Sequence, residues 1–534
     1  MNDPLAVAAG LLPAWTRWVC LIVVPMAFLA GLVAGAVVAW LGRALPAAPW
    51  TERARVSYPT RSALAITAVL AGATCGPFAL VFRSRLSSWP AWAFVAATAL
   101  AGFLGADVAR LVTERRVHRE HISAWSWYAA KPFTLFVRFP HVIVAGAFAV
   151  SMPARPGLAD APLMALCVLL ILAAGTGVCW LPLVAIGLAK RAPPRLAAIV
   201  ARASKRTAVT PRGVMLLPSL GSPVANAYAL PILRRLAFTE EALLVLDDDE
   251  IEAIAAHELG HVSEPRLVAW SRALGTLLVA PLAFARPVTR LVSDNGVKGV
   301  LGFLLGLVAF FAALRLLVRM ARRMEERADR IAGGDAHDVS EIYARALEKI
   351  YRRNLVPAVL GKGKSGARVH PDLYDRLIAS GVVPEYPRPA PPNVAGALRR
   401  GVVVVAASGA LLALVGPWVR ATLEERVVSE LGDRAMAAAD AGEYPEAIDL
   451  FEAAESLAPH DPKLRLQRAA LLSRLDECDD AARELETAQR YRAEDELDEW
   501  FSAAHTSVFD CFRRKGFYFL GDPQSLAPTT DDVR

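Results

Sequence analysis

Residues 254–261, Ile-Ala-Ala-His-Glu-Leu-Gly-His, carry the pattern from which this chain is best interpreted. On an α-helix, residues i and i+4 lie on one face, so the imidazoles of His257 and His261 can bind one metal ion together. Glu258 lies beside the first histidine, where its carboxylate can take a proton from water at the metal. The pattern predicts a zinc-dependent hydrolase. The competing interpretation is a pair of surface histidines.

The surroundings of this segment favour the metal-binding interpretation. Residues 239–266 read as one amphipathic helix, with Asp247, Asp248 and Asp249 near its start, where the helix dipole favours negative charge. Its apolar face is formed by Leu246, Ile251, Ile254 and Leu259. Such a helix is expected to pack against a core and to hold the histidine pair in place.

Two histidines do not complete a catalytic zinc site, which usually has three protein ligands and a water. Glu264 lies on the same helix and would approach from the same side, so it cannot close a tetrahedron. The charged helical stretch 323–330 offers Glu325 and Asp329, again at i and i+4. One of them can bind the metal while the other holds a ligand histidine. The alternative for this stretch is a solvated face with ordinary ion pairs.

Together, the two segments resemble the membrane metallopeptidases of the HtpX and CAAX prenyl protease superfamily. The shared pattern is His-Glu-Leu-Gly-His followed by a Glu-x-x-Ala-Asp helix, and the resemblance covers roughly residues 190–380. It includes 224–230, similar to an Asn-Ala strand before the metal helix, and the acidic lead-in 243–250. It also includes His370-Pro371 with Arg376. The chain departs from the family at 231–235, where Pro-Ile-Leu-Arg-Arg replaces a Gly-rich turn.

The resemblance implies a role for each matching residue. One zinc ion per chain would be held by His257, His261 and Glu325. Glu258 would be the catalytic base. Asp329 would not bind the zinc ion itself but would hold one of the ligand histidines in place. The resemblance also implies that two further residues, Asn226 and His370, face the substrate or the developing oxyanion.

The composition is typical of a membrane protein. The chain is 55% hydrophobic, and its mean hydropathy is +0.36, which is high for a soluble chain of this length. Several apolar runs approach the roughly 20 residues that a spanning helix needs. The clear runs are 18–42, 62–82, 89–109, 161–189, 299–318 and 400–419, and the weaker ones, which contain Arg and Pro, are 133–152 and 267–285. Eight crossings are expected, the first of them an uncleaved span.

The proposed metal site constrains the topology. If one zinc ion joins His261 and Glu325, an even number of crossings separates them, so 267–318 is expected to form an embedded hairpin. Basic loops near residues 53–61, 110–119 and 190–195 place the metal domain in the cytoplasm by the positive-inside tendency. The net charge of +7 is spread over these loops and suits lipid head groups. Nucleic-acid binding has no support.

After residue 420 the chain becomes charged and Ala-rich, and it contains an internal repeat. Four positions recur with a displacement of 34 residues, namely Ala435, Ala447, Phe451 and Ala454 as Ala469, Ala481, Leu485 and Ala488. This period resembles the tetratricopeptide repeat, although Asp476 stands in the second copy where Gly442 stands in the first. A protein-docking module is the favoured interpretation, and a plain helical hairpin is the alternative. If the tail is extracytoplasmic, Cys478 and Cys511 could form a disulfide.

The expected fold is therefore mainly α: a polytopic membrane protein with a zincin-type metallopeptidase domain and a C-terminal helical-repeat tail. The domains are 1–189 with about five spans, 190–398 as the metallopeptidase, 399–420 as a further span, and 421–534 as the tail. The expected function is zinc-dependent endoproteolysis of membrane-associated or misfolded proteins in the cell (inner) membrane. A prenyl-peptide processing protease and a non-catalytic scaffold that recruits partners through its tail are the alternatives.

Overall fold

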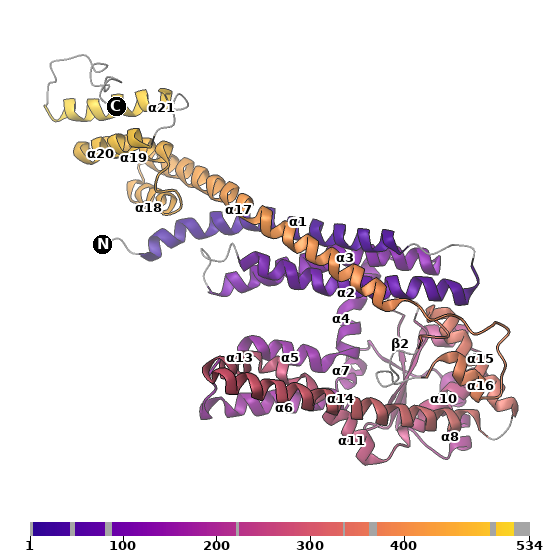
Figure 1. Cartoon of the computed structure of the whole chain (residues 1–534). Coiled ribbons are helices and arrows are strands. Elements are labelled where there is room, and N and C mark those ends of the chain that lie inside the picture. The colour runs from indigo at the N-terminus through magenta and orange to yellow at the C-terminus, as the bar shows by residue number, and fades with distance from the viewer. Residues whose placement is uncertain are drawn as a thin grey trace. The chain divides into compact units, whose positions relative to one another are not determined.

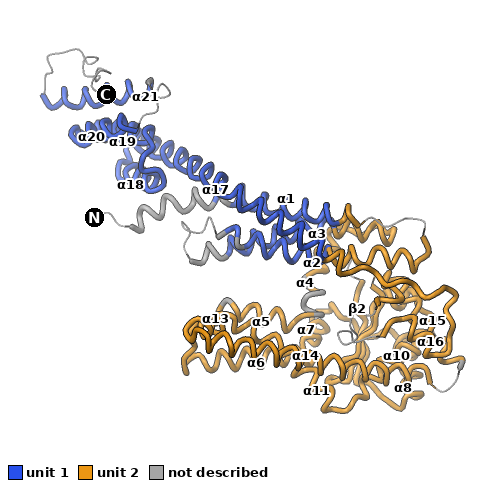
Figure 2. Tube along the Cα trace, viewed as in Figure 1, with its two compact units in different colours: residues 1–38, 64–109, 399–534 blue, residues 39–63, 110–398 orange. Residues whose placement is uncertain are grey.

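The computed structural model describes residues 4–42, 48–80, 88–219, 224–334, 337–361, 371–491 and 498–516. The chain divides into two compact units (Figure 2). Unit 1 contains residues 1–38, 64–109 and 399–534, and unit 2 contains residues 39–63 and 110–398. Each unit has its own apolar core, so each is described by itself.

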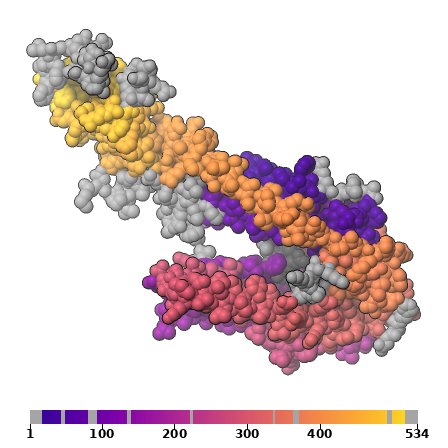
Figure 3. All heavy atoms as spheres, viewed as in Figure 1, coloured from indigo at the N-terminus to yellow at the C-terminus, as the bar shows by residue number. Residues whose placement is uncertain are grey.

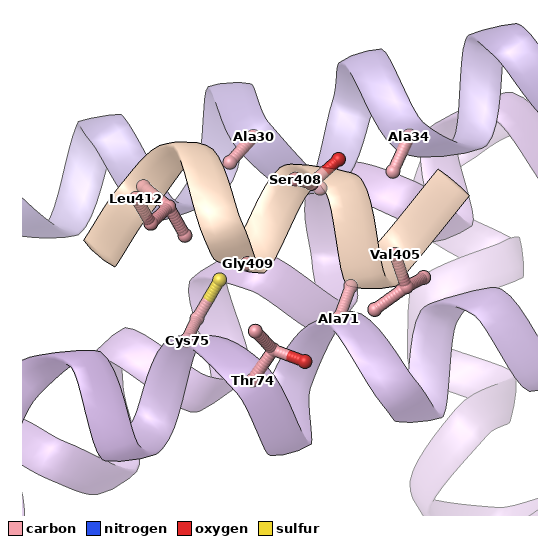
Figure 4. A pocket seen from close by; sticks show the side chains of 10 residues that line it. Ala30, Ala34, Ala71, Thr74, Cys75, Val405, Ser408, Gly409 and Leu412 are labelled. Carbon is pink, nitrogen blue, oxygen red and sulfur yellow. The ribbon is translucent and has the colours of Figure 1, made fainter. Parts of the chain in front are cut away.

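Unit 1 is built on long apolar helices (Figure 1). They are α1 (Pro4–Leu41), α2 (Trp50–Leu80), α3 (Ser88–His118) and α17 (Val394–Asp440), of which each has some residues in unit 2. Glycine permits the closest contact between α1 and α3, because a Cβ on Gly31 would lie 2.0 Å from the carbonyl oxygen of Gly102. Between α1, α2 and α17 there is a cavity of only about 10 Å³, lined by small residues such as Ala71 and Gly409 (Figure 4). It is too small for an organic ligand.

The tail of unit 1 continues from α17 as four shorter helices: α18 (Tyr444–Glu455), α19 (Pro462–Arg474), α20 (Cys478–Arg490) and α21 (Asp498–Arg514). Helix α17 is continuous through residue 420, where the sequence suggested a domain boundary. Of the eight repeat-related positions, all except Leu485 are fully buried. Gly442 and Asp476, 34 residues apart, both adopt positive φ angles, +83° and +58°, at turns between helices. The tail is thus repetitive in backbone conformation as well as in sequence, while its assignment to the tetratricopeptide family stays a prediction.

Cys478 and Cys511 form a disulfide that joins the start of α20 to α21. Both cysteines are buried. The side chain of Phe512, next to Cys511, packs against a small core cluster that contains Val508. The described cysteines outside the tail are free thiols.

Unit 2 contains a four-stranded sheet in the order β1-β2-β4-β3. The strands are β1 (Lys190–Arg191), β2 (Gly213–Leu217), β3 (Ala227–Leu230) and β4 (Arg235–Thr239). Strands β2 and β4 are parallel, whereas β1 and β3 pair antiparallel to their neighbours. The strand expected within 224–230 is therefore β3, at one edge of the sheet. Helices α8 (Pro194–Thr207), α9 (Glu240–Val245), α10 (Asp248–Val262), α15 (His337–Asn354) and α16 (Leu373–Ala379) complete this part.

The single helix expected over 239–266 is wrong, because the segment forms α9 and α10 with a break at residues 246–247. The break is caused by capping. The Asp247 side chain accepts a hydrogen bond from the N–H of Glu250, and the Glu250 carboxylate accepts one from the N–H of Asp247. This capping box begins a new helix at Asp248. The acidic cluster therefore does lie at a helix start, and that helix ends at Val262.

The remainder of unit 2 is helical. They are α4 (Ala124–Arg138), α5 (Pro140–Ser151), η2 (Leu158–Asp160), α6 (Ala161–Gly175), α7 (Trp180–Ala185), α11 (Arg266–Gly275), η3 (Thr276–Val279), α12 (Ala280–Ala283), α13 (Ala285–Asp294) and α14 (Gly296–Gly333). The apolar part of α14 is uncovered: Leu305 is 70% exposed, Val308 67% and Phe311 60%. Side chains of this segment form one open face in the space-filling view (Figure 3). A contiguous exposed surface of this kind suits contact with lipid.

Several apolar helices of the described chain are long enough to cross a membrane, which agrees with a membrane protein. There are five, or six if the bent pair 266–294 is one span. They are Cys20–Leu41, Ala93–His118, Leu158–Gly175, Gly296–Gly333 and Val394–Asp440. This number covers the described residues alone, so the expected total of eight, within one or two, stays a prediction.

Three of the expected runs are interrupted, namely the two weaker ones and the clear run 161–189. Run 133–152 breaks between α4 and α5 at Phe139, which precedes a proline. Run 161–189 breaks at Gly177, whose φ is +83°. Run 267–285 is divided among α11, η3 and α12, and its continuation bends by 60° before α13. The hairpin expected over 267–318 is thus one broken arm followed by the straight helix α14.

Candidate metal centre

Helices α10 and α14 pack closely at the predicted site because α10 has a glycine, Gly260, at the contact. A Cβ on Gly260 in α10 would lie 3.0 Å from the Cα of Ala328 in α14, so any side chain there would force the helices apart. Arg327 of α14 donates from Nη1 to the carbonyl oxygen of Gly260 at 2.9 Å and from Nη2 to Ser263 Oγ at 3.1 Å. This guanidinium satisfies the C-terminal end of α10. The two contacts fix the histidine-bearing turn against α14.

The meeting of α10 and α14 brings His257, His261 and Glu325 together. One ligand-type atom from each residue lies within 4.8 Å of the others, and all three residues are buried. The Nε2 atoms of the two histidines are 3.3 Å apart. The carboxylate of Glu325 approaches His257 Nε2 to 3.6 Å and His261 Nε2 to 3.4 Å. Three atoms that can each donate a lone pair therefore converge on one point.

The other ring nitrogen of His261 is held by Glu264. His261 Nδ1 lies 2.7 Å from Glu264 Oε1, and the Glu264 side chain is only 1% exposed. Arg272 of α11 lies 2.9 Å from the same carboxylate oxygen. Because the carboxylate accepts a hydrogen bond from Nδ1–H, the lone pair for a metal is left on Nε2.

His257 is held in the same way by a network from three other helices. Its Nδ1 lies 2.8 Å from the Tyr343 hydroxyl and 3.1 Å from Asp329 Oδ1. The Tyr343 hydroxyl donates to Asp329 at 2.7 Å, so its oxygen can accept from His257 Nδ1–H. Arg376 of α16 donates to Asp329 at 2.6 Å and to the Tyr343 oxygen at 2.7 Å. The network again directs the Nε2 lone pair of His257 toward Glu325.

The electrostatic environment of the site favours positive charge. Burial alone would lower the pKa of His261, but hydrogen bonds to Glu264 and Glu325 outweigh it and raise that pKa to about 10. Burial likewise opposes protonation of His257, yet its hydrogen bonds with Asp329 and Glu325 raise its pKa. Three carboxylates, those of Glu264, Glu325 and Asp329, thus surround two imidazoles, an arrangement that attracts a cation.

The other residues predicted for the site lie outside the group of three converging side chains or outside the described residues. Glu258 is half-buried on α10, one residue after His257. Asn226 precedes β3, and its backbone is fixed by Thr239, whose Oγ1 accepts from the Asn226 N–H at 2.9 Å. His370 lies outside the described residues, so its predicted role near the substrate is left as a prediction. Its neighbour in the same motif, Arg376, belongs to the network around Asp329.

Three contributions were missed from the sequence. Tyr343 follows His257 by 86 residues, and no spacing signal connects them. Glu264 was considered only as a ligand, although its i+3 spacing to His261 suits a supporting carboxylate. Asn354, at the end of α15, binds the backbone next to Asn226. Its side chain accepts a hydrogen bond from the Ala225 N–H at 3.0 Å and donates one to the Ala225 carbonyl oxygen at 2.8 Å.

The sequence of this part of the chain agrees with that geometry. Residues 191–380 match peptidase family M48. The matched range contains the converging histidines and Glu325 as well as the network of Tyr343, Asp329 and Arg376. The M48 match supports a protease, and it coincides with a His-His-Glu site of the kind expected in metal-dependent enzymes.

The chain is also similar to an individual known protein. Over 136 residues the chain is 33% identical to a protein named "Protease HtpX homolog" from Picrophilus torridus. The aligned region is 24% of this chain and 43% of that protein. The chain thus spans less than half the length of this curated relative. The family match and this relative thus give the same likeness, in a chain whose described residues include several apolar helices long enough to cross a membrane.

Proposed function

We propose that the chain is a membrane-embedded, zinc-dependent metalloendopeptidase with one zinc ion held by His257, His261 and Glu325. The observation that carries the proposal is the orientation of the two imidazoles. Both have Nδ1 engaged by an acceptor and Nε2 turned toward the same carboxylate. Histidine pairs oriented in this way by outer carboxylates are typical of metal sites.

The donor set fits zinc. Two ligand atoms that each lie about 2.0–2.1 Å from a tetrahedral zinc ion are separated by about 3.3 Å. The Nε2 atoms of His257 and His261 are 3.3 Å apart, and Glu325 approaches them with its two oxygens, Oε1 at 3.4 Å from His261 and Oε2 at 3.6 Å from His257. Two imidazoles and one carboxylate leave a fourth position for water or substrate, as in catalytic zinc sites.

The proposed chemistry is hydrolysis of a peptide bond. A zinc ion held there would polarise the scissile carbonyl and make water more acidic. Glu258 takes the proton of the attacking water and then delivers it to the leaving amine. The helix permits this role: His257 and His261 share one face, and Glu258 is offset from that face, so its carboxylate is left for proton transfer. Glu264, Tyr343 and Asp329 keep both imidazoles in one orientation throughout.

Strand β3 offers a place for the substrate backbone. It pairs with β4 on one side and is the last strand of the sheet in the described chain. An extended peptide can add to such an edge through main-chain hydrogen bonds. Asn226, directly before β3, would then lie beside the bound peptide, as the family resemblance implies. Membrane-associated or misfolded proteins would supply suitable extended segments, which makes them the proposed substrates.

Peptide mapping tests this proposal. Purified full-length protein is incubated with an unfolded model substrate such as reduced casein, and fragments are identified by mass spectrometry. Internal fragments with two new ends are expected, and a zinc chelator should abolish them. Removal of single terminal residues, or intact substrate, would contradict endoproteolysis and favour the scaffold alternative.

The proposed third ligand can be separated from its neighbour. Glu325 is buried at the site, whereas Glu326 is 50% exposed and pairs with Arg322 at i−4. Glu325→Ala should therefore lower bound zinc below about one tenth of the normal amount, since only two ligands remain. Glu326→Ala is the matched control and should be nearly silent, because exposed ion pairs contribute little. Zinc content by atomic emission decides between them. A reversed result would mean that α14 presents its other face to α10.

We also propose that the metal site lies on the cytoplasmic side and the tail on the opposite side. The apolar part of α17, residues 400–419, separates them along the chain, and at 1.5 Å per residue it is about 30 Å long, which matches a bilayer core. The disulfide in the tail supports an oxidising compartment. One crossing by α17 would let the tail contact protein partners on the far side.

Thiol labelling tests the location of the tail. A variant whose four free cysteines, Cys20, Cys75, Cys167 and Cys179, are replaced by alanine leaves only the tail pair. In intact cells (spheroplasts, if an outer membrane is present), after mild reduction, a membrane-impermeant maleimide should label Cys478 and Cys511. Labelling that occurs only after lysis would place the tail in the cytoplasm.

A further inference from the structure

Unit 2 contains a second cavity, which the proposed peptidase chemistry does not use. Its volume is about 580 Å³, within the range of pockets that hold small ligands. Its wall combines the aromatic ring of Trp50 with four groups that carry or can carry positive charge, namely Arg53, His118, Arg352 and Arg353. They come from the start of α2, the end of α3 and the end of α15.

Two of the four cationic groups are already neutralised. Arg353 donates from Nε to Glu241 at 2.5 Å and from Nη2 to Glu120 at 3.0 Å. His118 lies 3.3 Å from Glu114, which also accepts from Arg61. These pairs hold the wall of the cavity together.

Arg53 and Arg352 carry the excess charge. Arg53 donates from Nη2 to the carbonyl oxygen of Val117 at 2.6 Å, which anchors one edge of its guanidinium. Arg352 is exposed. Neither forms a salt bridge among the residues that the structure describes, although Glu348, one helical turn before Arg352 on α15, attracts its guanidinium. Two guanidinium groups on one cavity wall, next to an aromatic ring, form a site for an anion, and guanidinium suits phosphate in particular.

The place of the cavity along the chain points to the source of the phosphate. The span Cys20–Leu41 ends seven residues before Ala48, the first residue of the cavity wall, and the span Ala93–His118 ends on a wall residue. Residues at the ends of spans lie at the depth of lipid head groups. Basic pockets between helices at this depth bind anionic lipid head groups.

We propose that this cavity binds the head group of one anionic phospholipid, with Arg53 and Arg352 contacting its phosphate and Trp50 at its rim. The site lies on α15, the same helix that carries Tyr343. A bound head group would therefore contact the start of α2, the end of α3 and the end of α15, the helix that supports His257 through Tyr343.

Native mass spectrometry of the detergent-solubilised full chain tests this proposal without reference to proteolysis. The protein is mixed with equal amounts of phosphatidylglycerol and phosphatidylcholine. One phosphatidylglycerol per chain should be retained preferentially. Arg53→Gln together with Arg352→Gln should reduce the retained fraction at least tenfold. The control is Lys205→Gln with Arg206→Gln, an exposed basic pair on α8 that removes the same charge and should change retention less than twofold.

Three results would overturn the assignment. Equal retention of both lipids would exclude selection for net negative charge. Unchanged retention in the Arg53/Arg352 variant would place the lipid elsewhere. Displacement of the lipid by about 10 mM inorganic phosphate would mean that the site binds the free ion. A variant that fails to fold does not end the test, because hydrogen exchange of the unsubstituted protein in nanodiscs should show phosphatidylglycerol-dependent protection at residues 48–53 and 350–355.

Discussion

Replacing His257 and His261 together by alanine is expected to abolish both zinc binding and proteolysis. Only Glu325 would remain of the three converging ligand atoms, and a single carboxylate does not retain a catalytic zinc ion. The zinc content should fall from one ion per chain to background, and cleavage of casein should fall to the rate of a buffer control. Atomic emission and fragment analysis on the same preparation measure both quantities.

The matched control is His121→Ala, an exposed histidine in the same unit. It should leave zinc content and cleavage unchanged. Because His257 and His261 are buried, circular dichroism should confirm that the double variant retains its helices. A folded double variant that still holds stoichiometric zinc would remove the proposed ligand set.

Glu258→Gln should separate metal binding from catalysis. The amide keeps the size of the side chain but cannot take a proton from water, so turnover should fall by about 10²–10⁴-fold. Zinc content should remain at one ion per chain, because the three proposed ligands are intact. Initial cleavage rates, normalised to bound zinc, give the measurement.

Glu252→Gln is the control on the same helix. Glu252 pairs with Arg202 of α8 at 2.7 Å and lies outside the proposed ligand set, so its loss should change turnover less than twofold. If Glu258→Gln loses zinc in proportion to activity, the glutamate is a ligand or a structural group, and the role of base is wrong.

Much of the site follows from local spacing. The pairs His257/His261 and Glu325/Asp329 each lie one helical turn apart. The structure brings the two histidines and Glu325 to one point, and it places Asp329 at the other ring nitrogen of His257. What cannot be read from spacing is the support given by other helices. Tyr343 and Arg376 reach the site only through tertiary packing of α15 and α16. The close approach that Gly260 permits to Ala328 is likewise visible only in the folded chain.

The fold was predictable in its helical and membrane-like character but not in its boundaries. The apolar runs identified most long helices, yet hydropathy alone did not locate the break at Phe139 or the turn at Gly177. The division into α9 and α10 depends on a capping box that competes with helix propagation through Asp247. In the tail, Gly442 and Asp476, which are 34 residues apart, share a left-handed backbone conformation.

The central claim is that one zinc ion at His257, His261 and Glu325 is required for peptide hydrolysis. Zinc titration tests it most directly. Purified full-length protein is stripped of metal with a chelator, the chelator is removed, and zinc is added back while bound metal and casein cleavage are measured together. Cleavage should be absent in the stripped protein, rise in proportion to bound zinc, and reach its maximum at one ion per chain. Full cleavage by the metal-free protein would contradict the account.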